Sequence, residues 1–140
     1  IIATDHAPHT IDEKMNPYPK APSGGPVVQH ALSVLLECHL QGKISIEKIV
    51  QKTAHNPAKL FDIDRRGFVR EGYYADLVLV DMNAPYAVSK NNILYKCGWS
   101  PLEGQSFKSQ VTQTIVNGIL VYDQGKFLNH KAAMPVAFNR

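Results

Sequence analysis

The sequence predicts an α/β fold that continues into a strand-rich layer, and three patterns support this prediction. An apolar, β-branched run over residues 1–4 ends at Asp5, as expected for the last residue of a buried strand. Apolar residues then recur at three- and four-residue spacing over residues 27–40, which indicates an amphipathic helix. Residues 111–116 alternate between apolar and polar side chains, which is typical of a half-buried strand.

The first strand ends in a group of polar side chains. Asp5, His6 and His9 follow the apolar run within five positions, and Pro8 prevents an ordinary helical continuation. In parallel α/β folds, and above all in (β/α) barrels, catalytic groups lie at the carboxyl ends of strands. Successive strand residues point to opposite faces, so we expect Asp5 to face a site and His6 to be hydrogen-bonded away from it.

Residues 10–25 are rich in Pro, Gly, Asn and Lys and show no periodicity, so they predict a long loop. Loops of this length in compact domains are often lids or binding loops. Within it, the small residues Ala21 to Gly25, including Ser23 and Gly24, allow backbone N–H groups to approach an anion closely. The alternative is plain loop sequence.

Residues 26–64 predict two helices. Pro26 suits a first helical turn, and the apolar pattern that follows ends before Gly42. Ser45 can cap a second helix, which we expect to end at His55-Asn56-Pro57.

From residue 65 onward the pattern indicates short strands and tight turns. We expect strands at residues 68–69, 75–81, 111–116 and 119–122, with Asn117-Gly118 forming a type I′ turn. This predicts two units, residues 1–64 with a strand, a loop and closing helices, and residues 65–140 with part of a small β-sandwich or barrel-like layer.

Composition limits the classes of function. With 44% hydrophobic and 19% charged residues, the chain is ordinary globular material with no run long enough to cross a bilayer. The net charge of +3 comes from scattered residues, so nucleic-acid binding is not indicated. Cys38 and Cys97 form no Cys-x-x-Cys pair, so we expect neither a disulfide framework nor a structural zinc site, and a cytoplasmic location.

From its position alone, Asp5 has two interpretations. A carboxylate at the tip of a barrel strand can bind a metal ion and accept a proton from water that the metal acidifies. The alternative is a turn carboxylate that satisfies nearby backbone amides. A lone Asp would favour the second interpretation.

The wider sequence resembles dihydroorotases of the amidohydrolase superfamily. Thr4-Asp5-His6-Ala7-Pro8-His9, with Glu13-Lys14, is similar to their last barrel strand and the loop after it. The similarity continues through Ala21–Pro26, Asn56–Ala58, Ala75–Val78, Ser100–Gly104 and Val116–Gly118. It implies the C-terminal part of a metal-dependent hydrolase TIM barrel, followed by part of a β-sandwich. A full barrel needs roughly 250 residues, so we expect this 140-residue chain to be a piece of such an enzyme.

The resemblance also implies roles for individual residues. Asp5 would bind one zinc ion of a mono- or binuclear centre and act as the catalytic proton shuttle. His9 would hold the α-carboxylate of the substrate, and the loop with Ser23 and Gly24 would add main-chain bonds to it. The implied reaction is the reversible, zinc-dependent cyclisation of N-carbamoyl-L-aspartate to L-dihydroorotate in pyrimidine biosynthesis.

The remaining zinc ligands of the family do not occur in this sequence, which contains no His-x-His. We therefore expect the chain alone to be metal-poor and inactive. Apolar faces over residues 26–61 would lack partners, so we expect association with itself or with the rest of the polypeptide, as a homo-oligomer. Two alternatives stay open: a hydantoinase- or allantoinase-like cyclic amidase, against which His9 argues, and a non-catalytic scaffold protein, which could lose Asp5 and His9.

Overall fold

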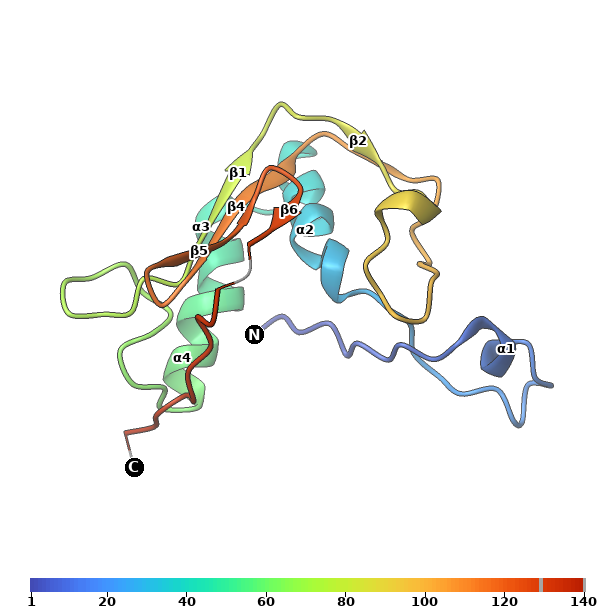
Figure 1. The fold of residues 1–140 in the computed structure, drawn as a ribbon, viewed down its shortest axis with the longest axis horizontal. Coiled ribbons are helices and arrows are strands. Elements are labelled where there is room, and N and C mark those ends of the chain that lie inside the picture. Colours follow the sequence, from blue (N-terminus) through green and yellow to red (C-terminus); the bar gives the residue numbers. More distant parts are fainter. Residues whose placement is uncertain (129, 140) are drawn as a thin grey trace.

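The computed structural model describes residues 1–128 and 130–139. Figure 1 shows three parts: an N-terminal arm over residues 1–27, a central group of helices, and an antiparallel sheet that lies beside the helices. The arm extends away from the helices to the short helix α1 (Ile11–Lys14) and then returns to them. The arm and the helices therefore meet at the residues that precede α2.

The predicted strand at residues 1–5 does not form. Residues 1–4 are extended but have no neighbouring strand in the described part of the chain, and a strand is stable only when it is paired. Two contacts position this segment: Ile2 N donates to Lys52 O at 3.0 Å, and an isolated parallel bridge joins His6 to Gly25. Asp5 ends the extended segment in the left-handed region, with φ of 47°.

The first predicted helix forms and ends where expected, but its start is later than predicted, because Pro26 and Val27 are not helical. A single 3₁₀ turn, η1 (Val28–His30), leads into α2 (Ala31–Leu40), and the chain leaves the helix at Gly42 with φ of 71°. Ser45 caps α3 (Ile46–Val50) as predicted, since its hydroxyl accepts a hydrogen bond from Lys48 N at 3.2 Å.

The predicted end of the second helix at residues 55–57 is wrong. The chain continues from α3 through a π-helical turn, η2 (Gln51–His55), into α4 (Asn56–Leu60). Asn56 N donates to Gln51 O, five residues back, and Asn56 itself has helical backbone angles. The wider turn lets the helix continue past Pro57, whose ring and missing N–H would otherwise interrupt an α-helix.

The main sheet contains four antiparallel strands in the order β1-β4-β5-β6. Their bounds are Leu77–Asp81 for β1, Gln110–Val116 for β4, Ile119–Asp123 for β5 and Lys126–Phe127 for β6. Asn117 and Gly118 have φ of 51° and 80°, so the predicted type I′ turn joins β4 to β5. No strand forms at residues 68–69; there the Phe68 ring stacks on His55, with a centroid distance of 4.3 Å.

A second, two-stranded ribbon connects the sheet to the arm. It pairs β2 (Tyr86–Ala87) with β3 (Ser106–Phe107), and the connection between them contains the 3₁₀ turn η3 (Lys90–Asn92). Phe107 of the ribbon and Val88, which directly follows β2, are each 1% exposed, as is His30 before α2. The buried core of this region therefore lies between the ribbon and the start of α2, where the His30 and Phe107 rings stack with a centroid distance of 6.4 Å.

The described helices are too short or too polar for any of them to span a bilayer. The helices α1 to α4 all precede residue 65 and the paired strands all follow it, in keeping with the change in sequence pattern. The division into units at residues 1–64 and 65–140 stays a prediction.

Candidate functional site

Three segments that are distant in sequence converge around the Asp5–His9 motif. Ala7 N donates to Gly25 O at 3.1 Å, which joins the motif to the loop at residues 21–25. From the connection between β2 and β3, Trp99 Nε1 donates to His9 O at 2.8 Å. Pro101 of the same connection lies against Gly25. The motif and the loop that sequence analysis singled out are therefore in direct contact.

Asp5 is exposed at the point where the chain turns into the motif. Its left-handed backbone is unusual for a residue other than glycine and is tolerated best by Asn and Asp. Its carboxylate makes no hydrogen bond or ion pair with any of the described residues, so the interpretation as a turn carboxylate finds no support. The carboxylate is available to a ligand from outside this chain.

His6 is held by the backbone that leads into α2. Its Nδ1 accepts hydrogen bonds from Val27 N at 3.2 Å and Val28 N at 3.4 Å, so Nε2 carries the proton of the neutral ring. Its ring also lies 5.2 Å from that of Tyr95. The expectation that His6 is hydrogen-bonded structurally is confirmed.

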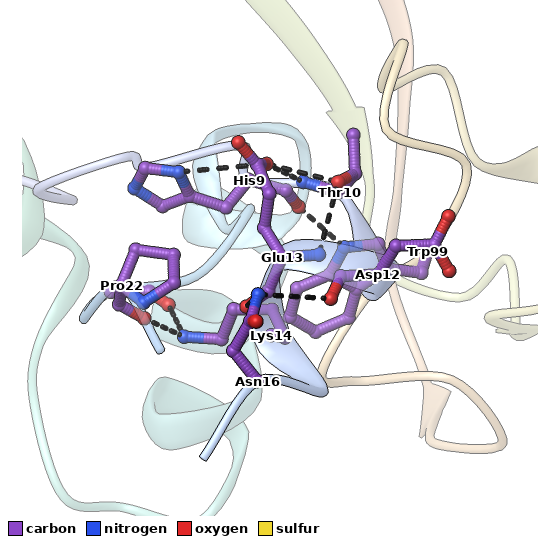
Figure 2. Close-up of polar contacts among 9 residues, drawn as sticks. His9, Thr10, Asp12, Glu13, Lys14, Asn16, Pro22 and Trp99 are labelled. Atoms are coloured by element: carbon purple, nitrogen blue, oxygen red, sulfur yellow. Dashed lines mark hydrogen bonds and ion pairs between the residues drawn. The ribbon is translucent and has the colours of Figure 1, made fainter. Parts of the chain in front are cut away.

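His9 lies at the start of α1 beside an acidic partner. Its Nδ1 is 3.8 Å from Glu13 Oε2, and its side chain is 38% exposed (Figure 2). Glu13 also completes a capping box: Thr10 N donates to Glu13 Oε2 at 2.7 Å, and Glu13 N donates to Thr10 Oγ1 at 3.3 Å. Thr10 N and Oγ1 both donate to Glu13 Oε2, and these two hydrogen bonds, with a smaller contribution from His9, hold the pKa of Glu13 below its usual range. Glu13 thus stays a carboxylate that orients His9.

Gly24 fits closely against the motif. Its φ is +82°, and a Cβ at this position would lie 2.6 Å from the Cβ of Ala7. Ser23 and Gly24 are both exposed, so the loop presents its backbone to solvent beside the motif. A residue with any side chain would force the loop away from Ala7.

The chain supplies few groups that could hold a metal ion. No three His, Cys, Asp or Glu residues among those described lie close enough together to do so. A structural or catalytic zinc site takes at least three protein ligands, so the described residues do not form a complete one.

The family model of the amidohydrolase family matches residues 1–121, which is most of the chain. The chain belongs to the amidohydrolase family. This match confirms the resemblance that the Asp5–His9 motif indicated.

Individual relatives agree with the family assignment. A dihydroorotase from Endomicrobium trichonymphae is 40% identical over 122 residues, which cover 86% of this amidohydrolase chain and 29% of the relative. A dihydroorotase from Halobacterium salinarum is 40% identical over 123 residues, or 88% of this chain and 29% of the relative. The chain thus spans less than a third of the length of these relatives.

A solved structure supports the fold. The D-hydantoinase from Bacillus sp. AR9 has a TM-score of 0.79 to this chain, with 26% sequence identity, and the match covers 89% of this chain and 29% of that one. The predicted fold class, part of an amidohydrolase barrel with its accompanying β-structure, is confirmed.

Two residues of this amidohydrolase site were missed as site residues by sequence reasoning. Lys14 Nζ donates to the loop carbonyls Pro22 O at 2.6 Å and Gly24 O at 2.9 Å, and Trp99 binds the motif from 90 positions away. Lys14 belongs to the Glu13-Lys14 pair that the family resemblance includes, whereas Trp99 belongs to none of the matching segments. No local signal in the sequence indicates which carbonyl groups these two side chains contact.

Proposed function

We propose that this chain is the C-terminal portion of a dihydroorotase, which interconverts N-carbamoyl-L-aspartate and L-dihydroorotate. The observation that carries the proposal is the direct contact of the Asp5–His9 motif with the loop at residues 21–25. This contact joins the segment that carries Asp5 and His9 to an exposed, glycine-containing loop. The dihydroorotase relatives at 40% identity support the same reaction.

Asp5 acts as the proton carrier in this proposal. In the hydrolytic direction its carboxylate takes a proton from the attacking water and delivers it to the ring nitrogen that leaves. In the synthetic direction the same proton moves back. The exposed carboxylate suits this role, because without a hydrogen bond or ion pair to a described residue its oxygens are free to accept a proton.

His9 and the loop bind the substrate carboxylate. The imidazole of His9, oriented by Glu13, donates to one carboxylate oxygen, and backbone N–H groups near Ser23 and Gly24 donate to the other. An anion held in this way places the scissile ring amide next to Asp5. A substrate without a carboxylate would lose these contacts.

The proposal includes a zinc ion bound in part by Asp5, with the other ligands from outside this chain. When bound, zinc acidifies water and polarises the amide carbonyl. Because this chain offers a single candidate ligand, the isolated 140 residues should contain well under one zinc per chain and be inactive. The whole protein is proposed to be a cytoplasmic homo-oligomer that acts in pyrimidine biosynthesis.

The second candidate is a cyclic amidase of the hydantoinase or allantoinase type, which the structural similarity to a D-hydantoinase favours. His9 argues against it, because hydantoins carry no carboxylate for that imidazole to bind. A non-catalytic scaffold is a third candidate, but it gives no reason for an unpaired Asp5 and a His9 in contact with Glu13 within the same short motif.

Steady-state turnover of dihydroorotate, hydantoin and allantoin by the whole protein that contains this chain distinguishes these candidates. We expect kcat/KM for dihydroorotate to exceed that for the other two by more than 100-fold, about 3 kcal/mol of selectivity from the carboxylate contacts. His9→Ala should remove most of this preference. Higher kcat/KM for hydantoin would support the second candidate, and no turnover of any substrate by metal-loaded protein would support the scaffold.

A further inference from the structure

Lys14 connects two parts of the candidate site through a pair of backbone hydrogen bonds. It lies on the single turn α1, directly after the motif, and its side chain crosses to the loop (Figure 2). There Nζ donates to Pro22 O at 2.6 Å and to Gly24 O at 2.9 Å. One ammonium group therefore holds the carbonyls on both sides of Ser23.

These bonds fix the direction of one free N–H group. The described chain contains no cis peptide bond, so the Pro22–Ser23 peptide is planar and trans, and its N–H points opposite to the carbonyl that Lys14 holds. Ser23 N makes no hydrogen bond to a described residue. The Ser23 N–H is thus directed away from Lys14 and available to a ligand. A carbonyl bound to an ammonium also polarises its peptide, which strengthens the N–H as a donor.

Lys14 itself is held in place from two directions. The capping box of Thr10 and Glu13 orders the turn that carries it. Trp99 holds His9 O at 2.8 Å, which fixes the chain just before that turn. The position of the loop relative to His9 therefore depends on a chain of contacts that ends at the Lys14 ammonium.

We propose that Lys14 is a positioning residue that aims the Ser23 N–H at the substrate carboxylate held by His9. This inference rests on the proposed function. It adds that one side chain, Lys14, determines the position of the loop. Lys20 of the same loop is a matched control, because its ammonium makes no hydrogen bond or ion pair with a described residue.

The test compares Lys14→Met, Lys14→Arg and Lys20→Met in the whole protein with dihydroorotate as substrate. Lys14→Met should raise KM about tenfold and change kcat less than threefold, because a charge-assisted bond that orders a binding group is lost. Lys14→Arg, which keeps the charge and several donors, should return KM to within threefold of the original. Lys20→Met should match the original protein. Equal KM in Lys14→Met and Lys20→Met, or no rescue by arginine, would overturn the proposal.

Amide hydrogen exchange at Ala7 separates this inference from the proposed function. The Ala7 N–H donates to Gly25 O, so its exchange rate reports the order of the loop without any substrate. Lys14→Met should speed this exchange about tenfold, and Lys20→Met should leave it unchanged. If Lys14→Met speeds Ala7 exchange but the protein does not turn over dihydroorotate, the proposed function is refuted and the role of Lys14 in ordering the loop is retained. Unchanged exchange in Lys14→Met would refute the positioning role even in an active dihydroorotase.

Discussion

Replacing Gly24 by alanine perturbs the closest contact between the motif and its loop. The new methyl group would lie 2.6 Å from the Cβ of Ala7, far inside van der Waals contact, on a backbone with φ of +82°. The loop must then move or change its backbone angles. Either response separates Gly25 from Ala7 and breaks their hydrogen bond of 3.1 Å.

The size of the effect follows from two contributions. A left-handed backbone costs an alanine about 1–2 kcal/mol. Loss of the Ala7–Gly25 hydrogen bond adds about 1 kcal/mol. The total of about 2–3 kcal/mol corresponds to roughly 30- to 150-fold faster exchange of the Ala7 amide, if the loop opens before exchange. In the whole protein, Gly24→Ala should also raise KM for dihydroorotate, because the displaced loop binds the substrate carboxylate in the proposed function.

Two further variants isolate the cause. Gly72→Ala has a φ of +76° with no atom within 4 Å of the new Cβ, so it should cost local stability near residue 72 and leave Ala7 exchange unchanged. Ala7→Gly combined with Gly24→Ala removes the colliding methyl group and should restore part of the protection. If Gly24→Ala exchanges like the original chain at Ala7, the contact between motif and loop is not as described.

Other predictions concern the surrounding framework. Arg66 binds the partly exposed Asp76 and donates to Asn117 Oδ1 at 2.7 Å, so Arg66→Ala should lower the free energy of unfolding by about 2 kcal/mol in urea titrations through the loss of charge-assisted hydrogen bonds. The exposed pair of Arg65 with Asp64 is screened by solvent and should contribute much less, so equal losses in Arg65→Ala and Arg66→Ala would contradict this. Burial lowers the pKa of His30 below its ordinary 6.5, so the unfolded chain binds a proton that the folded chain does not. Stability should be full above pH 6.5 and fall below it; His30→Gln should flatten that slope, and an unchanged slope would refute the assignment.

Local signals in the sequence were sufficient for part of the fold. The helix end at Gly42, the cap at Ser45 and the hairpin at Asn117-Gly118 depend on backbone preferences of the residues themselves, and all three formed as predicted. The motif and its loop were also located from sequence, because together they resemble the last barrel strand and the following loop of dihydroorotases. Their contact through Gly24 and Ala7 is consistent with that reading.

Features that depend on distant partners could not be predicted. The run at residues 1–4 has strand composition, but pairing requires a neighbouring strand that the described chain does not contain. The helix continued past Pro57 because a π-helical turn absorbed the interruption, and local propensity does not indicate such a turn. Lys14 and Trp99 act through bonds to loop and motif carbonyls, and no pattern in the sequence specifies which carbonyl a side chain will reach.

The central claim is that Asp5 moves the proton during reaction on a cyclic amide. Its most direct test is kcat for dihydroorotate in the whole, zinc-loaded protein with Asp5→Asn, which keeps the shape of the side chain and removes the base. General acid–base catalysis is worth about 10²–10⁴-fold, so kcat should fall by at least 100-fold while circular dichroism and the amide exchange of Ala7 stay unchanged. A kcat within tenfold of the original would contradict the account.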